Sequence, residues 1–199
     1  MKRFAQFLLA MAFIVPAFAG DLVFAPDTNH TVLGFKASTI LFDVPGRFNS
    51  YRVELTGDPN APETAKIKLT LHTSSINTAV KQRDEHLKSE DFFDAATYPR
   101  IVFTSSKVWK DSGKVFVMGT LDMHGVKKEL TLAFDPINAK NGAGMDTWAF
   151  KTSAKLNRKD YGIGTDSIAA KISLKDEVEL NLLLVGFFNE PKAPAPKKK

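Results

Sequence analysis

The chain has 199 residues, 44% of them hydrophobic and 25% charged, which suits one folded domain of ordinary composition. It has no cysteine, so disulfides, thiolate metal sites, a cysteine nucleophile and lipoprotein acylation are excluded. The formal charge of +5 resides at the chain ends, with two charges at Lys2 and Arg3 and three net charges in residues 190–199, so the neutral remainder gives no reason to expect a nucleic-acid partner.

Residues 1–19 have the features of an export signal. A basic start is followed by the apolar run 7–15, by Pro16, and by the small-x-small sequence Ala17-Phe18-Ala19. The run is too short to span a membrane as a helix, which needs about 20 apolar residues. We therefore expect cleavage before Gly20, export to the periplasm, and no integral membrane segment in the mature chain.

Alternating apolar and polar residues predict strands in the first half of the mature chain. The alternation covers residues 32–37, 51–55 and 66–72, and a period of two is typical of strands with one face in water. Pro45-Gly46 and Gly57-Asp58-Pro59 are expected to be turns between them.

One helical segment interrupts this pattern. Residues 81–89 have a helix-favouring composition without Gly or Pro, and Leu87 is their main apolar contact. Phe92-Phe93 adds a bulky apolar anchor, and Tyr98-Pro99 ends any helix because the residue before a proline disfavours helical geometry.

Strand patterns return after this segment and continue to the end of the domain. They cover residues 101–106, 114–123, 128–134, 145–156 and 178–184. About eight evenly spaced strands predict an all-β fold, a sandwich or an antiparallel barrel, with one short helical insertion. The domain is expected to span residues 20–189, and the Pro-, Ala- and Lys-rich tail 190–199 is expected to be a disordered basic segment.

Four segments, in order along the chain, resemble the YceI-like family of bacterial periplasmic proteins. They are DTNHTVLGFKAS, RDEHLKSEDFFDAATYP followed by IVFTSS, GTLDMHGVKKELTL, and LNRKDYGIG followed by DEVELNLLL. Tyr161 stands where the family usually has phenylalanine. The resemblance implies a lipocalin-like antiparallel barrel that binds a long apolar molecule, often a polyisoprenoid, and it implies no established catalytic residues.

No motif indicates catalysis, a metal or a cofactor. The four histidines lack the close spacings of zinc motifs, and neither HExxH nor a GxSxG nucleophile elbow occurs. Gly162-Ile163-Gly164 lacks the third glycine and the flanking elements of a dinucleotide fingerprint. We therefore expect no metal, no cofactor and no enzymatic activity.

Arg83, Asp84 and His86 form a polar cluster beside Leu87 that has two interpretations. The cluster is either a clamp for a ligand head group at the mouth of the barrel, or a set of polar contacts that holds the helix to the barrel. The second interpretation requires no ligand, because hydrogen bonds and charge complementarity within the protein are enough to fix a loop.

Bulky apolar residues on the strands and on the helical segment are candidates for the ligand-binding cavity lining. An eight-stranded barrel is wide enough either to be filled by side chains or to hold one slim ligand. The candidates are Leu33, Phe35, Phe92, Phe93, Phe103, Phe116, Trp148 and Phe150.

The leading functional interpretation is a periplasmic protein that sequesters or carries a long-chain apolar ligand such as a polyisoprenoid, an isoprenoid quinone or a fatty-acid-like lipid. Alternatives are an outer-membrane β-barrel and an enzyme acting on a lipid or quinone precursor. The small number of Trp and Tyr residues and the charged strands disfavour the membrane barrel. A homodimer is left open.

Overall fold

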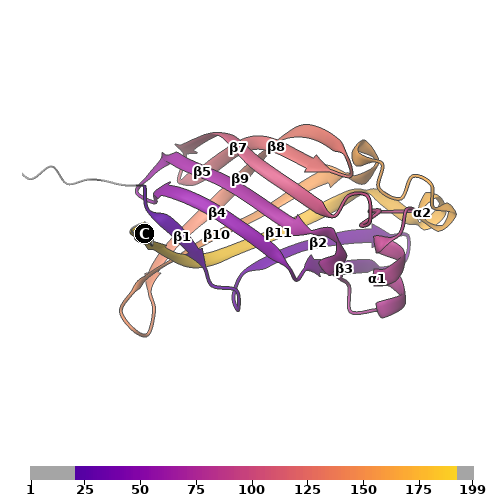
Figure 1. Ribbon diagram of the computed structural model, residues 1–199, viewed down its shortest axis with the longest axis horizontal. Coiled ribbons are helices and arrows are strands. Elements are labelled where there is room, and N and C mark those ends of the chain that lie inside the picture. The colour runs from indigo at the N-terminus through magenta and orange to yellow at the C-terminus, as the bar shows by residue number, and fades with distance from the viewer. Residues whose placement is uncertain (1–20, 192–199) are drawn as a thin grey trace, which may run out of the picture.

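Eight antiparallel strands close into a barrel in the computed structural model, which describes residues 21–191 (Figure 1). Each strand pairs with the next, and the last one closes the ring by pairing with the first. The strands are β1 (Val23–Pro26), β4 (Tyr51–Asp58), β5 (Ala61–His72), β7 (Arg100–Asp111), β8 (Lys114–Met123), β9 (Val126–Lys140), β10 (Asp146–Asn157) and β11 (Leu174–Asn189). The prediction of an antiparallel barrel of about eight strands is confirmed.

Three further strands extend the sheet along the long strand β11. Strand β1 pairs with the last part of β11, and β2 (Val32–Thr39) pairs with its earlier part. Strand β3 (Asp43–Phe48) then pairs with β2, and β6 (Ile76–Asn77) pairs with β3.

The predicted turn at Pro45-Gly46 is wrong, because both residues lie inside β3. Gly46 stands opposite Phe35 on β2, and the Phe35 ring covers the glycine. A side chain at position 46 would overlap that ring, so the glycine serves packing rather than a turn.

The helices gather at one end of the barrel, on the right of Figure 1. Helix α1 (Lys81–Lys88) agrees with the predicted helical segment. A second helix, α2 (Ile168–Ser173), was not predicted; its N-cap Ser167 accepts a hydrogen bond from the Ala170 N–H. Single 3₁₀ turns, η1 (Thr73–Ser75) and η2 (Arg158–Tyr161), lie at the same end.

Alternation along the strands separates an apolar interior from a charged exterior. On β5, Ile67 and Leu69 line the interior, whereas Lys66 and Lys68 are exposed. Many residues of the buried core come from β7, β8 and β9, where Val117 is only 2% exposed. The predicted signal 1–19 lies outside the described residues, as does the predicted tail beyond Pro191.

Candidate binding cavity

An elongated cavity of about 330 Å³ lies inside the barrel, and nearly all of its walls are apolar. Every strand of the ring except β1 contributes to the lining, together with β2, β3 and the helical end. Along β11 the lining runs from Leu174 to Phe188. Because barrel strands are tilted by about 40° to the barrel axis, this stretch of strand spans about 35 Å along the axis. The cavity is therefore long and narrow.

Side-chain exposure shows which walls face open space. Leu69 on β5 and Leu182 on β11 point inward yet are only half-buried. Val117 and Leu132, on β8 and β9, also border the cavity but are 2% and 5% exposed. The open space therefore lies beside β5 and β11, and the core fills the side of β8 and β9.

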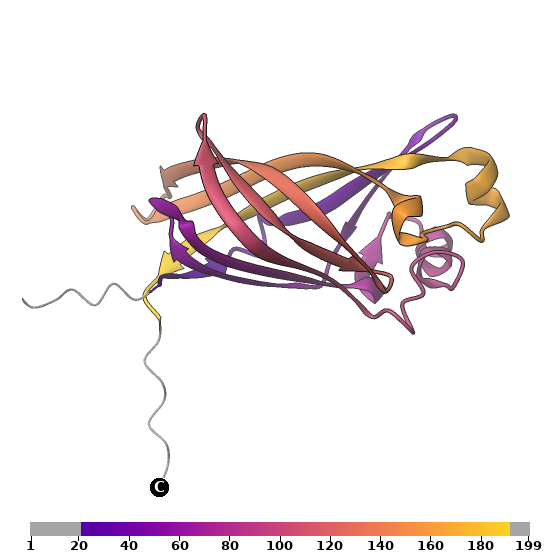
Figure 2. The same ribbon diagram turned by 90° about the horizontal axis from the view of Figure 1, so that it is seen from above.

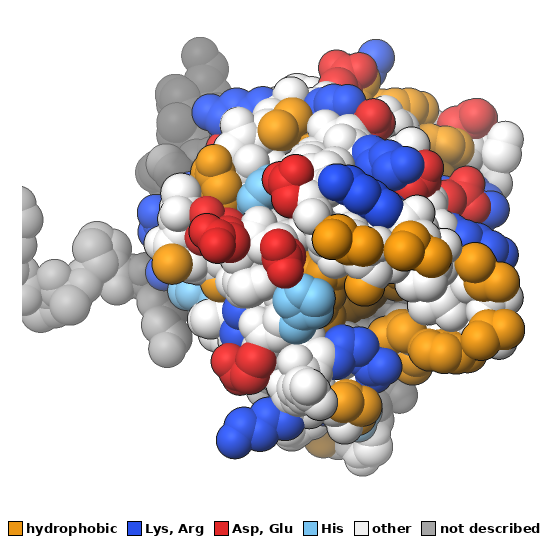
Figure 3. Space-filling view, turned by 90° about the vertical axis from the view of Figure 1, so that its right-hand side faces the viewer, with side chains coloured by type: hydrophobic (Ala, Val, Ile, Leu, Met, Phe, Trp, Pro, Cys, Tyr) orange, Lys and Arg blue, Asp and Glu red, His pale blue; other side chains and the backbone are white. Residues whose placement is uncertain are grey.

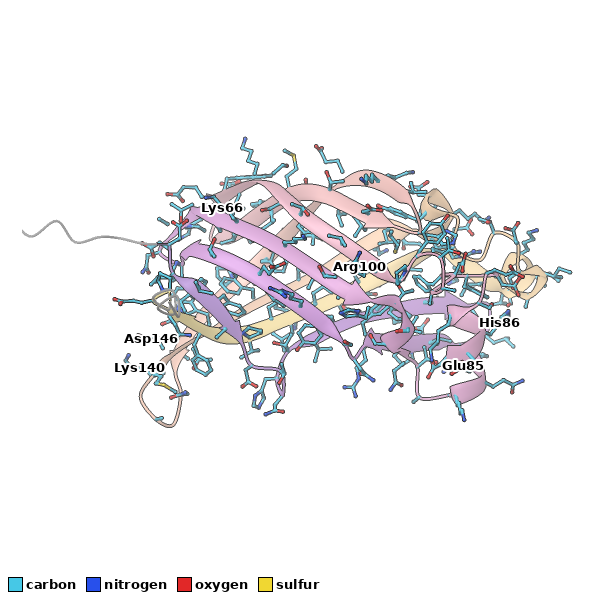
Figure 4. All side chains as sticks on the ribbon, viewed as in Figure 1. Lys66, Glu85, His86, Arg100, Lys140 and Asp146 are labelled. Atoms are coloured by element: carbon cyan, nitrogen blue, oxygen red, sulfur yellow. The ribbon has the colours of Figure 1, made fainter. Side chains whose placement is uncertain are left out.

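The two ends of the cavity differ in polarity. At the end of the β4–β5 and β7–β8 turns, the lining includes the exposed polar residues Asp58, Asn60 and Lys110. Lys66, Lys140 and Asp146 mark this end in Figure 4, opposite Glu85 and His86 on α1.

Buried or half-buried residues line the helical end instead, namely Leu87, Phe92, Phe93, Arg158, Ile163 and Leu174. The cavity thus has a polar, exposed end and a covered end whose lining is apolar apart from the buried Arg158.

Lys110 was not identified from the sequence, because a β-bulge changes the alternation of β7. Ile101 and Phe103 point inward, but the pairing of β7 with β8 shifts between Ser105 and Lys107. After the shift Val108 and Lys110 point inward. No ion pair is found for the Lys110 ammonium among the described residues.

Seven of the eight predicted lining residues border the cavity: Leu33, Phe35, Phe92, Phe93, Phe103, Trp148 and Phe150. Phe116 does not, because it lies on the opposite face of β8 from Val115 and Val117. Its ring stacks on that of Trp109 with 5.3 Å between the centroids. The polar residues Thr120 and Asp122 share this face of the strand and could have revealed its outward direction.

The cluster of Arg83, Asp84 and His86 lies outside the cavity lining. One Asp84 carboxylate oxygen accepts hydrogen bonds from the Thr78 N–H at 2.7 Å and from the Thr78 hydroxyl at 2.6 Å. The Arg83 guanidinium donates to the Thr78 hydroxyl and carbonyl oxygens, both at 2.8 Å. His86 contacts Asp91 at 2.8 Å. This arrangement matches the second interpretation, in which polar contacts fix the helix.

Arg158 stabilises the other segment of the covered end. Its side chain is 2% exposed, and it donates to the backbone oxygens of Lys175 and Ile163 and to the Asp176 carboxylate. These bonds join η2, the following loop and the start of β11, so the buried charge is hydrogen-bonded and paired. Arg158 therefore fixes the backbone that covers this end.

Two buried hydroxyl groups, Tyr51 Oη and Thr152 Oγ1, have no hydrogen-bond partner among the described residues. Thr152 lies on β10 between Phe150 and Leu156, with the same inward parity as these two lining residues. A buried hydroxyl without a partner is costly.

Burial and ion pairing shift the pKa values of two titratable groups on the barrel. Burial raises the pKa of the Tyr161 hydroxyl above its ordinary value. The Lys36 ammonium, 3.0 Å from Glu179, lowers the pKa of that carboxyl group.

Within residues 21–191 no group of three or more His, Asp or Glu side chains is arranged to hold a metal. None of the helices in that range is long and apolar enough to span a membrane.

Comparisons with solved structures agree with the barrel. The crystal structure of BcnA from Burkholderia cenocepacia covers 81% of this chain and 99% of its own, with a TM-score of 0.72 and 24% identity. A polyisoprenoid-binding domain from Saccharophagus degradans covers 85% and 98%, with a TM-score of 0.58 and 18% identity. At these identities the likeness concerns the fold.

Sequence comparisons show the family. A UPF0312 protein of Vibrio vulnificus is 32% identical over 180 residues, which cover 86% of this chain and 93% of that protein. The family model for the YceI-like domain matches residues 24–185, nearly the whole barrel. The chain therefore belongs to the YceI-like family, as its sequence motifs suggested.

Proposed function

We propose that this protein binds one long-chain apolar molecule in the lumen of its barrel. The observation that carries the proposal is the long, narrow cavity walled by apolar side chains. Binding would release water from both surfaces, which contributes about 0.8 kcal/mol for each buried methylene group. Ten such groups give roughly 8 kcal/mol before the cost of association is subtracted. Affinity should therefore rise with chain length.

The dimensions of the cavity favour a single chain over a compact ring system. Its lining extends along about 35 Å of the barrel axis, a length that an extended chain fills and a compact ring system does not. A polyisoprenoid, the tail of an isoprenoid quinone or a fatty-acid-like chain fits this shape. The Saccharophagus degradans domain, whose fold this chain shares, is described as polyisoprenoid-binding.

The polar end is suited to a ligand head group. Lys110 lines the cavity there, and Asp58 and Asn60 lie beside the same opening. A chain with a carboxylate or phosphate head would place its negative charge near the Lys110 ammonium and its tail toward Phe92. This orientation replaces the head-group clamp that the sequence suggested near His86.

We also propose that the protein acts in the periplasm as a carrier or store. The export signal in residues 1–19 supports this location. Cleavage before Gly20 is tested by intact-mass measurement of protein recovered from the cell envelope; a mature chain that retains residues 7–15 would contradict it.

Binding is proposed rather than catalysis or a membrane-spanning role. The charged side chains of the lining are Asp58, Lys110 and Arg158, and no His, Ser, Thr or Tyr side chain of the described residues lines the cavity, so the lining offers no pairing of a nucleophile with a base. The outward face of β5 carries Lys66 and Lys68, the reverse of the apolar outer band of a membrane barrel.

A chain-length series tests the proposal. Protein stripped of lipid is titrated with fatty acids and polyprenols of increasing length, and affinity should increase until the chain fills the cavity. Leu69→Trp, which places an indole in the open space, should block uptake, whereas Lys68→Trp on the outer face of the same strand should not. Equal affinity for all lengths, or equal binding by the two variants, would overturn it.

Ligands of equal length with and without a charged head test the orientation. Lys110→Ala should weaken only the anionic ligand, and the exposed Lys66→Ala is the control at the same end. Loss of the uncharged ligand as well would contradict the head-group assignment.

A further inference from the structure

The most exposed large apolar side chains of the described residues lie together. They are Leu41 at 87% exposure, Ile168 at 74%, Ile40 and Ile172 at 71%, and Phe42 at 59%. Ile137 follows at 55%. We call the first five residues the apolar tip.

Two segments that are far apart in sequence form the apolar tip. Residues 40–42 make the turn between β2 and β3, and Ile168 and Ile172 lie four residues apart on α2. The Ile40 N–H donates to the Ser173 carbonyl at 3.1 Å, and Thr39 pairs with Leu174. The two segments are therefore neighbours at the covered end of the barrel.

The shape of the apolar tip favours a soft, apolar medium as its occupant. The β2–β3 turn and α2 both project from the helical end (Figure 2), and hydrophobic side chains gather on one half of that face (Figure 3). Three consecutive residues at a hairpin turn point in different directions, yet Ile40, Leu41 and Phe42 are all exposed. A flat protein surface would cover part of this set, whereas lipid can surround a tip from every side.

Charge at the base of the apolar tip fits an anionic surface. Three of the nearby acids are paired: Asp43 and Glu179 contact Lys36, and Asp176 contacts Arg158. Asp166, just before α2, is exposed and has no basic partner among the described residues. Lys171 and Lys175, on and just after α2, are exposed and have no acidic partner among the described residues. Long basic side chains of this kind reach lipid phosphates while the apolar residues enter the bilayer.

We propose that the apolar tip docks the covered end of the barrel onto the surface of an anionic phospholipid bilayer. Residues 40–42 and the Ile168–Ile172 face of α2 enter the interface, and Lys171 and Lys175 contact the phosphates. Leu174, directly after α2, lines the cavity, so the docked face would include the cover of the ligand site. The inference goes beyond the proposed function and stands without it.

Vesicle flotation tests the proposal. The purified protein should float with vesicles of phosphatidylethanolamine and phosphatidylglycerol, and less with phosphatidylcholine alone. Combined Ile40→Ser, Leu41→Ser and Phe42→Ser should lower the vesicle partition constant by about tenfold or more, because burial of one large apolar side chain already contributes about that factor. Ile168→Ser with Ile172→Ser should also weaken binding.

Matched controls separate docking from general stickiness. Ile137→Ser with Met145→Ser removes two exposed apolar side chains from the polar end and should leave binding unchanged. Because the chain lacks cysteine, Leu41→Cys can carry an environment-sensitive dye, with Ala143→Cys as the comparison at the polar end. Only the dye at position 41 should shift to the blue on adding vesicles.

Three results would overturn the proposal. One is the absence of vesicle binding, and another is equal binding by the variant at residues 40–42 and the unchanged protein. The third is sedimentation showing a dimer that the same substitutions convert to monomer, which would assign the apolar tip to a second copy of the chain. Ligand uptake is measured on the same variants, so that a loss of vesicle binding can be distinguished from a loss of ligand binding in the cavity.

Discussion

The cavity predicts unequal costs for the same truncation on two walls of the barrel. Leu132 on β9 is 5% exposed, so Leu132→Ala should leave a new void and lower the free energy of unfolding by about 3–5 kcal/mol. Leu69 on β5 already borders open space, so Leu69→Ala should enlarge an existing cavity and remove only part of the transfer energy. Three buried carbon groups contribute about 2.4 kcal/mol, and the partial burial of Leu69 reduces this to about 1–2 kcal/mol.

Equilibrium unfolding in urea, with the protein stripped of lipid, measures both changes. Enlarging substitutions should give the same order: Leu69→Trp should cost less than about 1 kcal/mol, because the indole enters free space, and Leu132→Trp should cost about 1–3 kcal/mol through overpacking. Equal losses for the two alanine variants, together with strong destabilisation by Leu69→Trp, would show that the lumen is filled and would refute the reasoning.

Other predictions concern the cover and the titrating groups. Asp84→Ala removes the acceptor for the Thr78 N–H and hydroxyl and should lower unfolding free energy by about 1–3 kcal/mol, whereas the exposed Glu85→Ala should change it by less than about 0.5 kcal/mol; equal effects in urea would contradict the fixing role. The lowered pKa of Glu179 means that its stabilisation is present above the ordinary carboxylate pKa and is lost as pH falls below about 4. Glu179→Gln should flatten the acid limb of a stability–pH curve, and an unchanged limb would count against the pairing. Burial raises the pKa of Tyr161, so stability should fall as pH rises above about 10, and Tyr161→Phe should remove that fall; persistence of the fall in this variant would place its origin elsewhere.

The regular strands and α1 could be predicted from the sequence because their residues follow local rules. Alternation set the positions of β5 and β8, and Tyr98-Pro99 marked the end of the helical segment. Strand β3 could not be predicted in this way, because Pro45-Gly46 resembles a turn until the Phe35 ring is placed over the glycine.

The lining residues could be predicted only where the alternation along a strand showed which side chains point inward. Leu33 and Phe35 alternate with Val32, Gly34 and Lys36, and both line the cavity. Lys110 depends on a bulge that no local pattern reveals, since the extra residue arises from pairing with β8. The position of Asp84 against Thr78, and that of the apolar tip, depend on contacts between segments that the alternation of one strand does not encode.

Direct analysis of the native protein is the strongest test of the central claim that the lumen holds one long apolar chain. Protein purified from its own cell envelope is measured by native mass spectrometry and then extracted with organic solvent. The account predicts one long-chain lipid per protein molecule, retained by Lys68→Trp and missing from Leu69→Trp. A native protein without lipid, whose stripped form takes up no chain of any length, would contradict it.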